Sequence, residues 1–194
     1  MGVAIGKSGA IAVNFSQATN IEKVFAVGDC CEVFHRISKR WTHVPLGDIA
    51  NKQGRTLGRN LGGGTALFPG VVGAQSFRLF NLEVAAAGID EKEAVSSGYH
   101  PASTIVWGSA IGDVMPGAKK VGVKLVADRS SGKLLGAQAV GEMGAVSRIN
   151  VLSCALWGDM DLDDIAYLDL AYAPPFSGAW DVIHIAAQVL KKQI

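Results

Sequence analysis

The chain has 194 residues, of which 49% are hydrophobic and 18% charged, so it can bury a real core as one large or two small domains. Its 18 basic and 17 acidic side chains leave a net charge of +1 without a basic stripe, which argues against nucleic acid or an anionic membrane as a partner. No apolar run has the length of a membrane span and no signal peptide is recognisable, so we expect a cytoplasmic protein with a small-molecule or protein partner.

The first part of the chain resembles a piece of an α/β unit. Residues 10–14 and 24–27 are predicted as strands, and the second is an apolar run that ends at Gly28 and Asp29. Open α/β sheets bind ligands at the carboxyl ends of their strands, where glycine permits close approach and Asp29 offers an acceptor. The same ending is also typical of a simple turn in which the Asp bonds to nearby backbone, so the pattern alone leaves both possibilities open.

A helix is predicted from about residue 45 to residue 61. One stripe of this helix has almost no side chains, because small residues recur at spacings of three and four: Gly47, Ala50, Gly54 and Gly58. We therefore expect another segment to pack close against it. The glycine-rich stretch 60–70 then indicates a connection, which divides the chain into residues 1–65 and 66–194.

The second part consists of strands followed by helices. Strands are predicted at 75–89, 101–109, 121–127 and 133–141, with the last two forming a hairpin, and helices at 90–98, 145–157 and about 179–192. This order indicates an α+β fold, an antiparallel sheet with helices, preceded by an incomplete α/β fragment.

Cysteine, histidine and aspartate residues show no metal or redox pattern. Cys30, Cys31 and Cys154 form neither an even disulfide framework nor a C-x-x-C pair, so we expect them to be reduced and structural, like small buried hydrophobes. The four histidines lack ligand spacing and are expected to be structural or solvated. The aspartate run at 159–164 lacks the Gly and Glu of an EF-hand loop, so we interpret it as helix capping and expect no metal site.

Two segments of the first part resemble a known flavoprotein family. "ATNIEKVFAVGDC" (18–30) followed by "PLGDIANKQGRTLGRNL" (45–61) is similar to the second flavin-binding segment of the pyridine nucleotide-disulfide oxidoreductases. The resemblance implies that Asp29, after Gly28, accepts hydrogen bonds from the ribityl chain of FAD, and that Pro45, Leu46 and Gly47 lie against the flavin ring. A helix N-terminus at that place would stabilise the negative charge of a reduced flavin.

The remainder of the chain resembles the dimerisation domain of the same family. The stretch "LDLAYAPPFSGAWD" (168–181) is similar to the segment of the coenzyme A disulfide reductase and NADH oxidase branch. The resemblance implies that Tyr172 reaches the active site of the other subunit as a catalytic residue. Alternatively, Tyr172 only packs at the interface with its hydroxyl bonded to backbone. The His and Glu that other members use as acid and base here are missing, so a thiol-to-His relay is not expected.

The resemblance implies the C-terminal portion of an FAD-dependent NAD(P)H oxidoreductase that works as a homodimer. Its acceptor would be a small-molecule disulfide such as coenzyme A disulfide, or an oxygen-type acceptor. The 194 residues contain no G-x-G-x-x-G after a strand, so we expect the chain alone to be inactive and to hold FAD weakly. The alternative is a stand-alone dimerisation or assembly module without catalytic activity.

Overall fold

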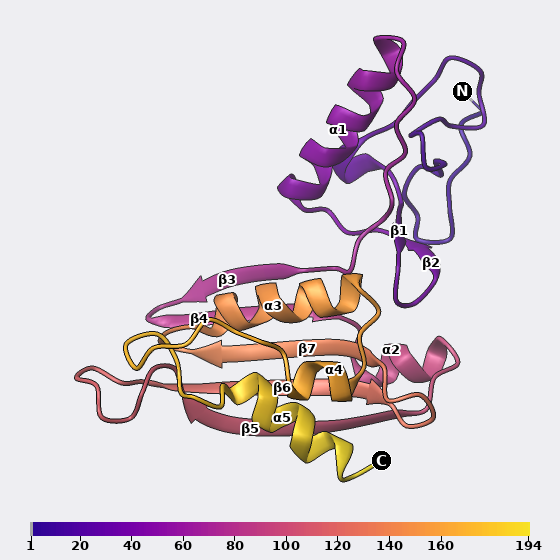
Figure 1. The fold of residues 1–194 in the computed structure, drawn as a ribbon. Coiled ribbons are helices and arrows are strands. Elements are labelled where there is room, and N and C mark those ends of the chain that lie inside the picture. The colour runs from indigo at the N-terminus through magenta and orange to yellow at the C-terminus, as the bar shows by residue number, and fades with distance from the viewer. Residues whose placement is uncertain (1) are drawn as a thin grey trace. The chain divides into compact units, whose positions relative to one another are not determined.

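The computed structural model describes residues 2–194 and contains two compact units, Met1–Val71 and Val72–Ile194 (Figure 1). Each unit is described by itself. In residues 2–194 no helix combines the length and the apolar character that crossing a membrane would require.

Unit 1 contains little regular structure besides one long helix. Its elements are η1 (Gly28–Cys30), β1 (Val33–His35), β2 (Arg40–Thr42) and α1 (Gly47–Leu61). The two short strands pair antiparallel, with Phe34 opposite Trp41. A small core forms between β1, α1 and the end of the unit, from Val33, Ile49, Phe68 and Val71. The predicted helix is confirmed, with its first residue at Gly47.

The two strands predicted at 10–14 and 24–27 are wrong. Ile11 makes single bridges to Ile5 and Cys31, and Phe25 makes one to Ala18. A strand needs neighbouring backbone along its length, and apolar composition alone does not supply it. Phe25 is also exposed, which a buried strand would not allow.

The small-residue stripe of α1 is covered at one position in unit 1. A Cβ added at Gly28 would lie 3.3 Å from the Cβ of Ala50, which is closer than ordinary van der Waals contact. Beside Gly47, Gly54 and Gly58, an added Cβ would meet no atom of the described chain within 4 Å. The close packing expected along the whole stripe is therefore found at Ala50 alone.

Unit 2 is built on a five-stranded sheet in the order β3-β4-β7-β6-β5, with every neighbouring pair antiparallel (Figure 1). The strands are β3 (Gln75–Leu79), β4 (Leu82–Gly88), β5 (Pro101–Ser109), β6 (Lys120–Asp128) and β7 (Leu134–Gly141). The helices are α2 (Glu91–Ser96), α3 (Ala145–Trp157), α4 (Leu162–Ala166) and α5 (Val182–Lys191). This arrangement confirms the predicted antiparallel sheet with helices.

Two boundaries in unit 2 differ from the prediction. Residues 75–89 form a hairpin rather than one strand, because the chain reverses at Phe80, whose φ of 53° is left-handed. The last helix begins at Val182 because the carboxylate of Asp181 accepts the N–H of Ile183 as an N-cap. The capping interpretation of the aspartate run is confirmed by Asp161, which forms a capping box with Asp164.

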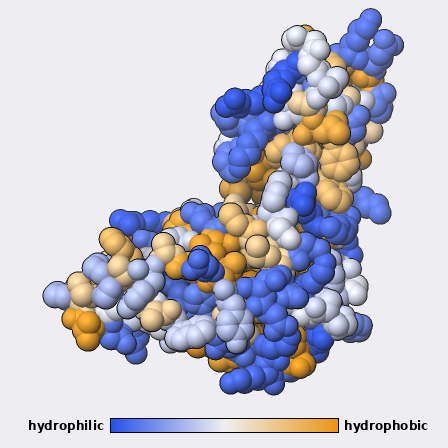
Figure 2. Space-filling view, in the orientation of Figure 1, coloured by the Kyte–Doolittle hydropathy of each residue, from blue (hydrophilic) through white to orange (hydrophobic). Residues whose placement is uncertain are grey.

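The two longest helices of unit 2, α3 and α5, cover one face of the sheet, while the short helix α2 contacts β5 and β6 on the other face, where Glu91 bonds to Ser103 and Lys124. α3 lies against β4 and β7, and α5 against β5 and β6, over fully buried residues such as Val123 and Leu125 (Figure 1). Figure 2 shows this helix side, where hydrophilic and hydrophobic residues are interspersed. On the opposite face, one row of opposed residues crosses all five strands: Phe77, Val84, Val140, Gly122 and Trp107. Its outer members Phe77 and Trp107 are exposed.

Gly136 in β7 offers a direct test of the sheet geometry. A Cβ at this residue would lie 2.0 Å from the carbonyl oxygen of Ile89, so Gly136→Ala should lower the free energy of unfolding by about 1–3 kcal/mol. Gly158→Ala is the matched control, because the added Cβ would come no closer than 3.4 Å to any neighbour. Urea unfolding of both variants measures the effect, and equal stability of the two would contradict the close strand approach.

Candidate functional site

Two side chains hold the backbone of the Gly28–Asp29 turn. The N–H of Gly28, which has a left-handed φ of 79°, donates to Oε1 of Gln53 at 2.8 Å. Nε2 of His43 bonds to the backbone carbonyl of Asp29 at 2.7 Å. Within residues 2–194 the carboxylate of Asp29 accepts no hydrogen bond, and the residue is exposed. The carboxylate is therefore available to a ligand.

The N-terminus of α1 lies beside this turn. Gly28 packs on Ala50, one turn into the helix, and η1 contacts α1. The N-cap residue Leu46 provides no side-chain cap, so the first N–H groups of the helix lack a side-chain acceptor. The structure thus places the Gly28–Asp29 turn beside the first two turns of α1, which begins at Gly47 directly after Pro45 and Leu46. Free N–H groups and the positive end of the helix dipole favour an anionic group there.

The thiols next to the turn differ in exposure. Burial raises the pKa of the Cys31 thiol to about 11, with Cys30 as a smaller cause, so Cys31 stays protonated at neutral pH. Its Sγ lies 3.4 Å from the carbonyl of Gly28 and 3.7 Å from Oε1 of Gln53. The expectation of a buried hydrophobe holds for Cys31, whereas Cys30 and Cys154 are free and exposed.

Sequence reasoning missed Gln53 and His43. Gln53 is buried and joins α1 to the turn. The sequence feature that could have indicated it is a polar residue three positions after Ala50, on the packed side of the helix. His43 was predicted to be structural or solvated, and it does bond to backbone, but at the candidate site itself. Within residues 2–194 no cluster of three or more His, Cys, Asp or Glu side chains could hold a metal ion.

Tyr172 lies in unit 2 on a segment without regular structure. Its side chain is 54% exposed and that of Phe176 is 74% exposed. A pocket of about 330 Å³ lies beside it, lined by Tyr167, Leu168, Asp169, Leu170, Tyr172, Ala179, Trp180 and His184. The ring of Trp180 packs edge-on against both Tyr167 and His184. The phenol of Tyr172 is therefore presented at the surface of unit 2.

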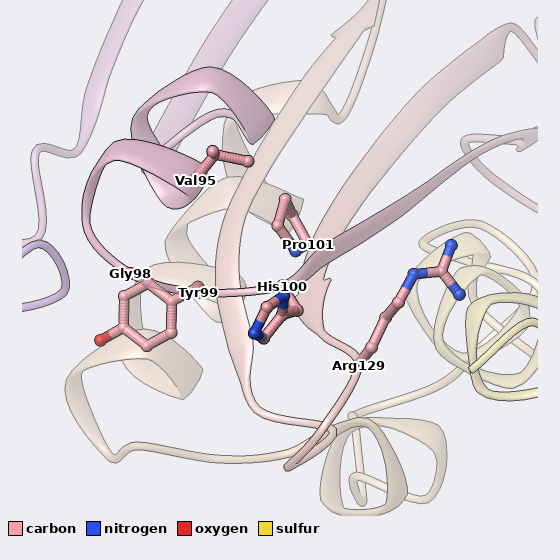
Figure 3. A pocket seen from close by; sticks show the side chains of 6 residues that line it. All are labelled: Val95, Gly98, Tyr99, His100, Pro101 and Arg129. Atoms are coloured by element: carbon pink, nitrogen blue, oxygen red, sulfur yellow. The ribbon is translucent and has the colours of Figure 1, made fainter.

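A second pocket of unit 2 lies between α2 and the β6–β7 turn. It measures about 400 Å³ and is lined by Val95, Gly98, Tyr99, His100, Pro101 and Arg129 (Figure 3). Tyr99 and Arg129 flank His100, and the Tyr99 hydroxyl points away from the other side chains (Figure 3). Burial raises the pKa of the Tyr99 phenol, and the carboxylates of Asp159 and Asp128 add to this. None of these six residues was predicted as a site residue from the sequence, where His100 was expected to be structural or solvated.

Comparison with known proteins gives consistent matches along the chain. The family model described as "Pyridine nucleotide-disulphide oxidoreductase, dimerisation domain" matches residues 74–183. The chain is 37% identical to the NAD(P)H sulfur oxidoreductase (CoA-dependent) of Pyrococcus abyssi, over 98% of this chain and 43% of that protein. Coenzyme A disulfide reductases and NADH oxidases are also among the matched relatives.

Solved structures show the same fold. An NAD-dependent persulfide reductase from A. fulgidus superimposes with a TM-score of 0.95 at 38% identity, over 99% of this chain and 36% of that one. An FAD-dependent pyridine nucleotide-disulphide oxidoreductase from Desulfovibrio vulgaris gives a TM-score of 0.82 at 28% identity, over 99% of this chain and 44% of that one. The chain spans less than half the length of each of these proteins.

Proposed function

Because the chain belongs to the pyridine nucleotide-disulphide oxidoreductase family, we propose that it works as the C-terminal portion of an FAD-dependent NAD(P)H oxidoreductase. The observation that carries the proposal is the contact in unit 1 between η1, which contains Asp29, and α1, whose N-terminus has no side-chain cap. In this proposal residues 1–65 contribute part of the flavin site and residues 66–194 form the homodimer interface. The compact units divide slightly later, after Val71.

The residues of unit 1 fit one end of a flavin. Asp29 would accept hydrogen bonds from ribityl hydroxyls, and Gly28, fixed by Gln53, leaves room for close approach. Pro45, Leu46 and Gly47 would lie against the ring, where the uncapped N–H groups favour negative charge. FAD, when bound, supplies hydride transfer between NAD(P)H and the acceptor.

The acceptor is assigned as a small-molecule disulfide such as coenzyme A disulfide. The names of matched relatives, a CoA-dependent sulfur oxidoreductase and a persulfide reductase, support sulfur chemistry, while matched NADH oxidases keep an oxygen-type acceptor as the alternative. Tyr172 of one subunit would donate its phenolic hydrogen to the leaving thiolate in the partner's site. Its exposure in the single chain is consistent with that role.

A stand-alone dimerisation or assembly module is the second candidate. It is favoured by the family model, which covers only the dimerisation domain. Flavin content of the complete protein separates the two, because an assembly module has no use for FAD.

Replacing Asp29 by Ala in the complete protein should weaken FAD binding about 10- to 100-fold, because buried ribityl hydroxyls lose a charged acceptor worth about 1.5–3 kcal/mol. Flavin retained after dialysis is the measurement. Glu22→Ala is the control, because Glu22 is an exposed acid whose ion pair with Lys23 is also exposed. Equal flavin content in both variants would show that Asp29 is only a turn residue.

A further inference from the structure

We propose that Arg148 is a positioning residue for Tyr172, acting through Asp181, His184 and the loop after Ala110. The inference rests on the proposed role of Tyr172. Tyr172 lies in the segment 167–181, which connects α4 to α5 and contains no helix or strand. Contacts with other elements must therefore hold its backbone.

The guanidinium of Arg148 is buried and binds three other residues. It binds Asp181 in a bidentate manner, Nη2 to Oδ2 at 2.7 Å and Nε to Oδ1 at 3.3 Å. Nη2 also donates to the carbonyl of Ala110 at 2.8 Å, and Nη1 to the carbonyl of Gly144 at 3.2 Å. Arg148 is 6% exposed and Asp181 7% exposed, so solvent hardly screens the pair. One side chain therefore joins α3, the end of β5 and the start of α5.

Asp181 and His184 fix both ends of the segment that carries Tyr172. The backbone N–H of Asp181 donates to Nδ1 of His184 at 3.1 Å, while the Asp181 carboxylate caps α5. This assigns the proton of the neutral imidazole to Nε2, which then donates to the carbonyl of Leu168 at 2.9 Å. The two ends of the segment, Leu168 and Asp181, are thus tied to one network.

The middle of the segment is held from the loop that Arg148 anchors at Ala110. Two residues later, the N–H of Gly112 donates to the carbonyl of Pro174 at 2.7 Å. A Cβ at Gly112 would lie 2.9 Å from that same oxygen, so only glycine permits this approach without a shift. Tyr172 lies two residues from this contact.

The bidentate geometry of the Arg148–Asp181 pair suits a positioning role. Buried ion pairs are often replaceable by apolar side chains without loss of stability, whereas a bidentate pair fixes direction as well as distance. Within one chain Tyr172 and Phe176 are largely exposed, so packing against their own chain does not set their position. The bonds from His184 to Leu168 and from Gly112 to Pro174 hold the backbone instead, and Arg148 fixes the elements that make these bonds.

Hydrogen exchange of the 194-residue chain tests the positioning role directly. Arg148→Lys keeps the charge but loses the planar fork, so amides of residues 169–178 should exchange about tenfold faster or more. Gly112→Ala should give the same local effect with the ion pair intact. Leu152→Ala is the matched control, because Leu152 is fully buried on the same helix but lies outside the network.

If exchange in 169–178 rises no more in Arg148→Lys than in Leu152→Ala at equal loss of stability, the proposal is overturned. Should Arg148→Lys not fold, Asp181→Asn replaces it, since asparagine keeps the helix cap while removing the charge. Unchanged local exchange in that variant would overturn the proposal equally.

The kcat of the complete protein is a second measurement. A purely structural role of Arg148 would not make its effect on kcat depend on Tyr172. Arg148→Lys should lower kcat to a similar extent as Tyr172→Phe, and the double variant should fall no further than the lower of the two. Additive losses would contradict positioning. Full turnover in Tyr172→Phe would instead overturn the proposed role of Tyr172, while the exchange measurement still decides whether Arg148 fixes the segment.

Discussion

The 194-residue chain purified by itself is expected to be colourless and to bind FAD about a thousandfold more weakly than the complete protein. Asp29 and the N-terminus of α1 can hold the ribityl and ring end. The 194 residues contain no G-x-G-x-x-G for the pyrophosphate, which would remain in water. Two or three missing charge-assisted hydrogen bonds at about 1.5–3 kcal/mol each account for that loss of affinity.

Titration with FAD and with riboflavin measures this effect. The chain should bind both ligands with similar weak affinity, because the adenosine and pyrophosphate of FAD find no partners in it. A yellow preparation with one FAD for each chain, or a strong preference for FAD over riboflavin, would show that other segments of the chain build the flavin site.

The second large effect concerns assembly. We expect the chain to form a homodimer that survives dilution to micromolar concentration, with Tyr172 and Phe176 at or near its interface. Pro174 and Pro175 stiffen the segment between them, so these exposed rings lose little entropy on association. Tyr172→Ala combined with Phe176→Ala should weaken the dimer about 100- to 1,000-fold, at about 2 kcal/mol for each anchor.

Light scattering gives the mass of the 20.3 kDa chain in solution. Applied to variants, it shows whether the dimer forms through Tyr172 and Phe176 or through the sheet face that α3 and α5 leave uncovered. The paired control is Ile105→Thr with Trp107→Thr, which replaces exposed residues of β5 by a residue that suits a strand. A dimer that survives the first pair and is lost with the second would move the interface to the sheet. A mass of one chain for the unaltered protein would contradict the dimer.

Local sequence pattern predicted unit 2 better than unit 1. The bounds of β5 and α3 agree with the prediction because β5 is rich in β-branched and aromatic residues and α3 has complete helical spacing. The hairpin of β3 and β4 was missed because its reversal at Phe80 contains neither glycine nor proline. Residues 24–27 have the composition of a strand, but only Phe25 finds a bridging partner, and pairing partners are not a local property.

The candidate site was likewise predicted only in part. Spacing along the chain indicated Gly28, Asp29 and the start of α1. The residues that hold them could not be predicted, because Gln53 lies 25 positions from Gly28 and His43 lies 14 positions from Asp29. Arg148 and Asp181 are 33 positions apart, and neither residue type in isolation indicates a buried pair.

We propose that these 194 residues work within a longer flavoenzyme, and the size and flavin content of the protein isolated from its source cells decide this. An antibody against residues 72–194 would recover the polypeptide for mass measurement and flavin analysis. Since the chain covers 43% of its Pyrococcus abyssi relative, we expect a polypeptide more than twice as heavy as 20.3 kDa, with one FAD for each chain. A flavin-free polypeptide of 20.3 kDa would contradict it.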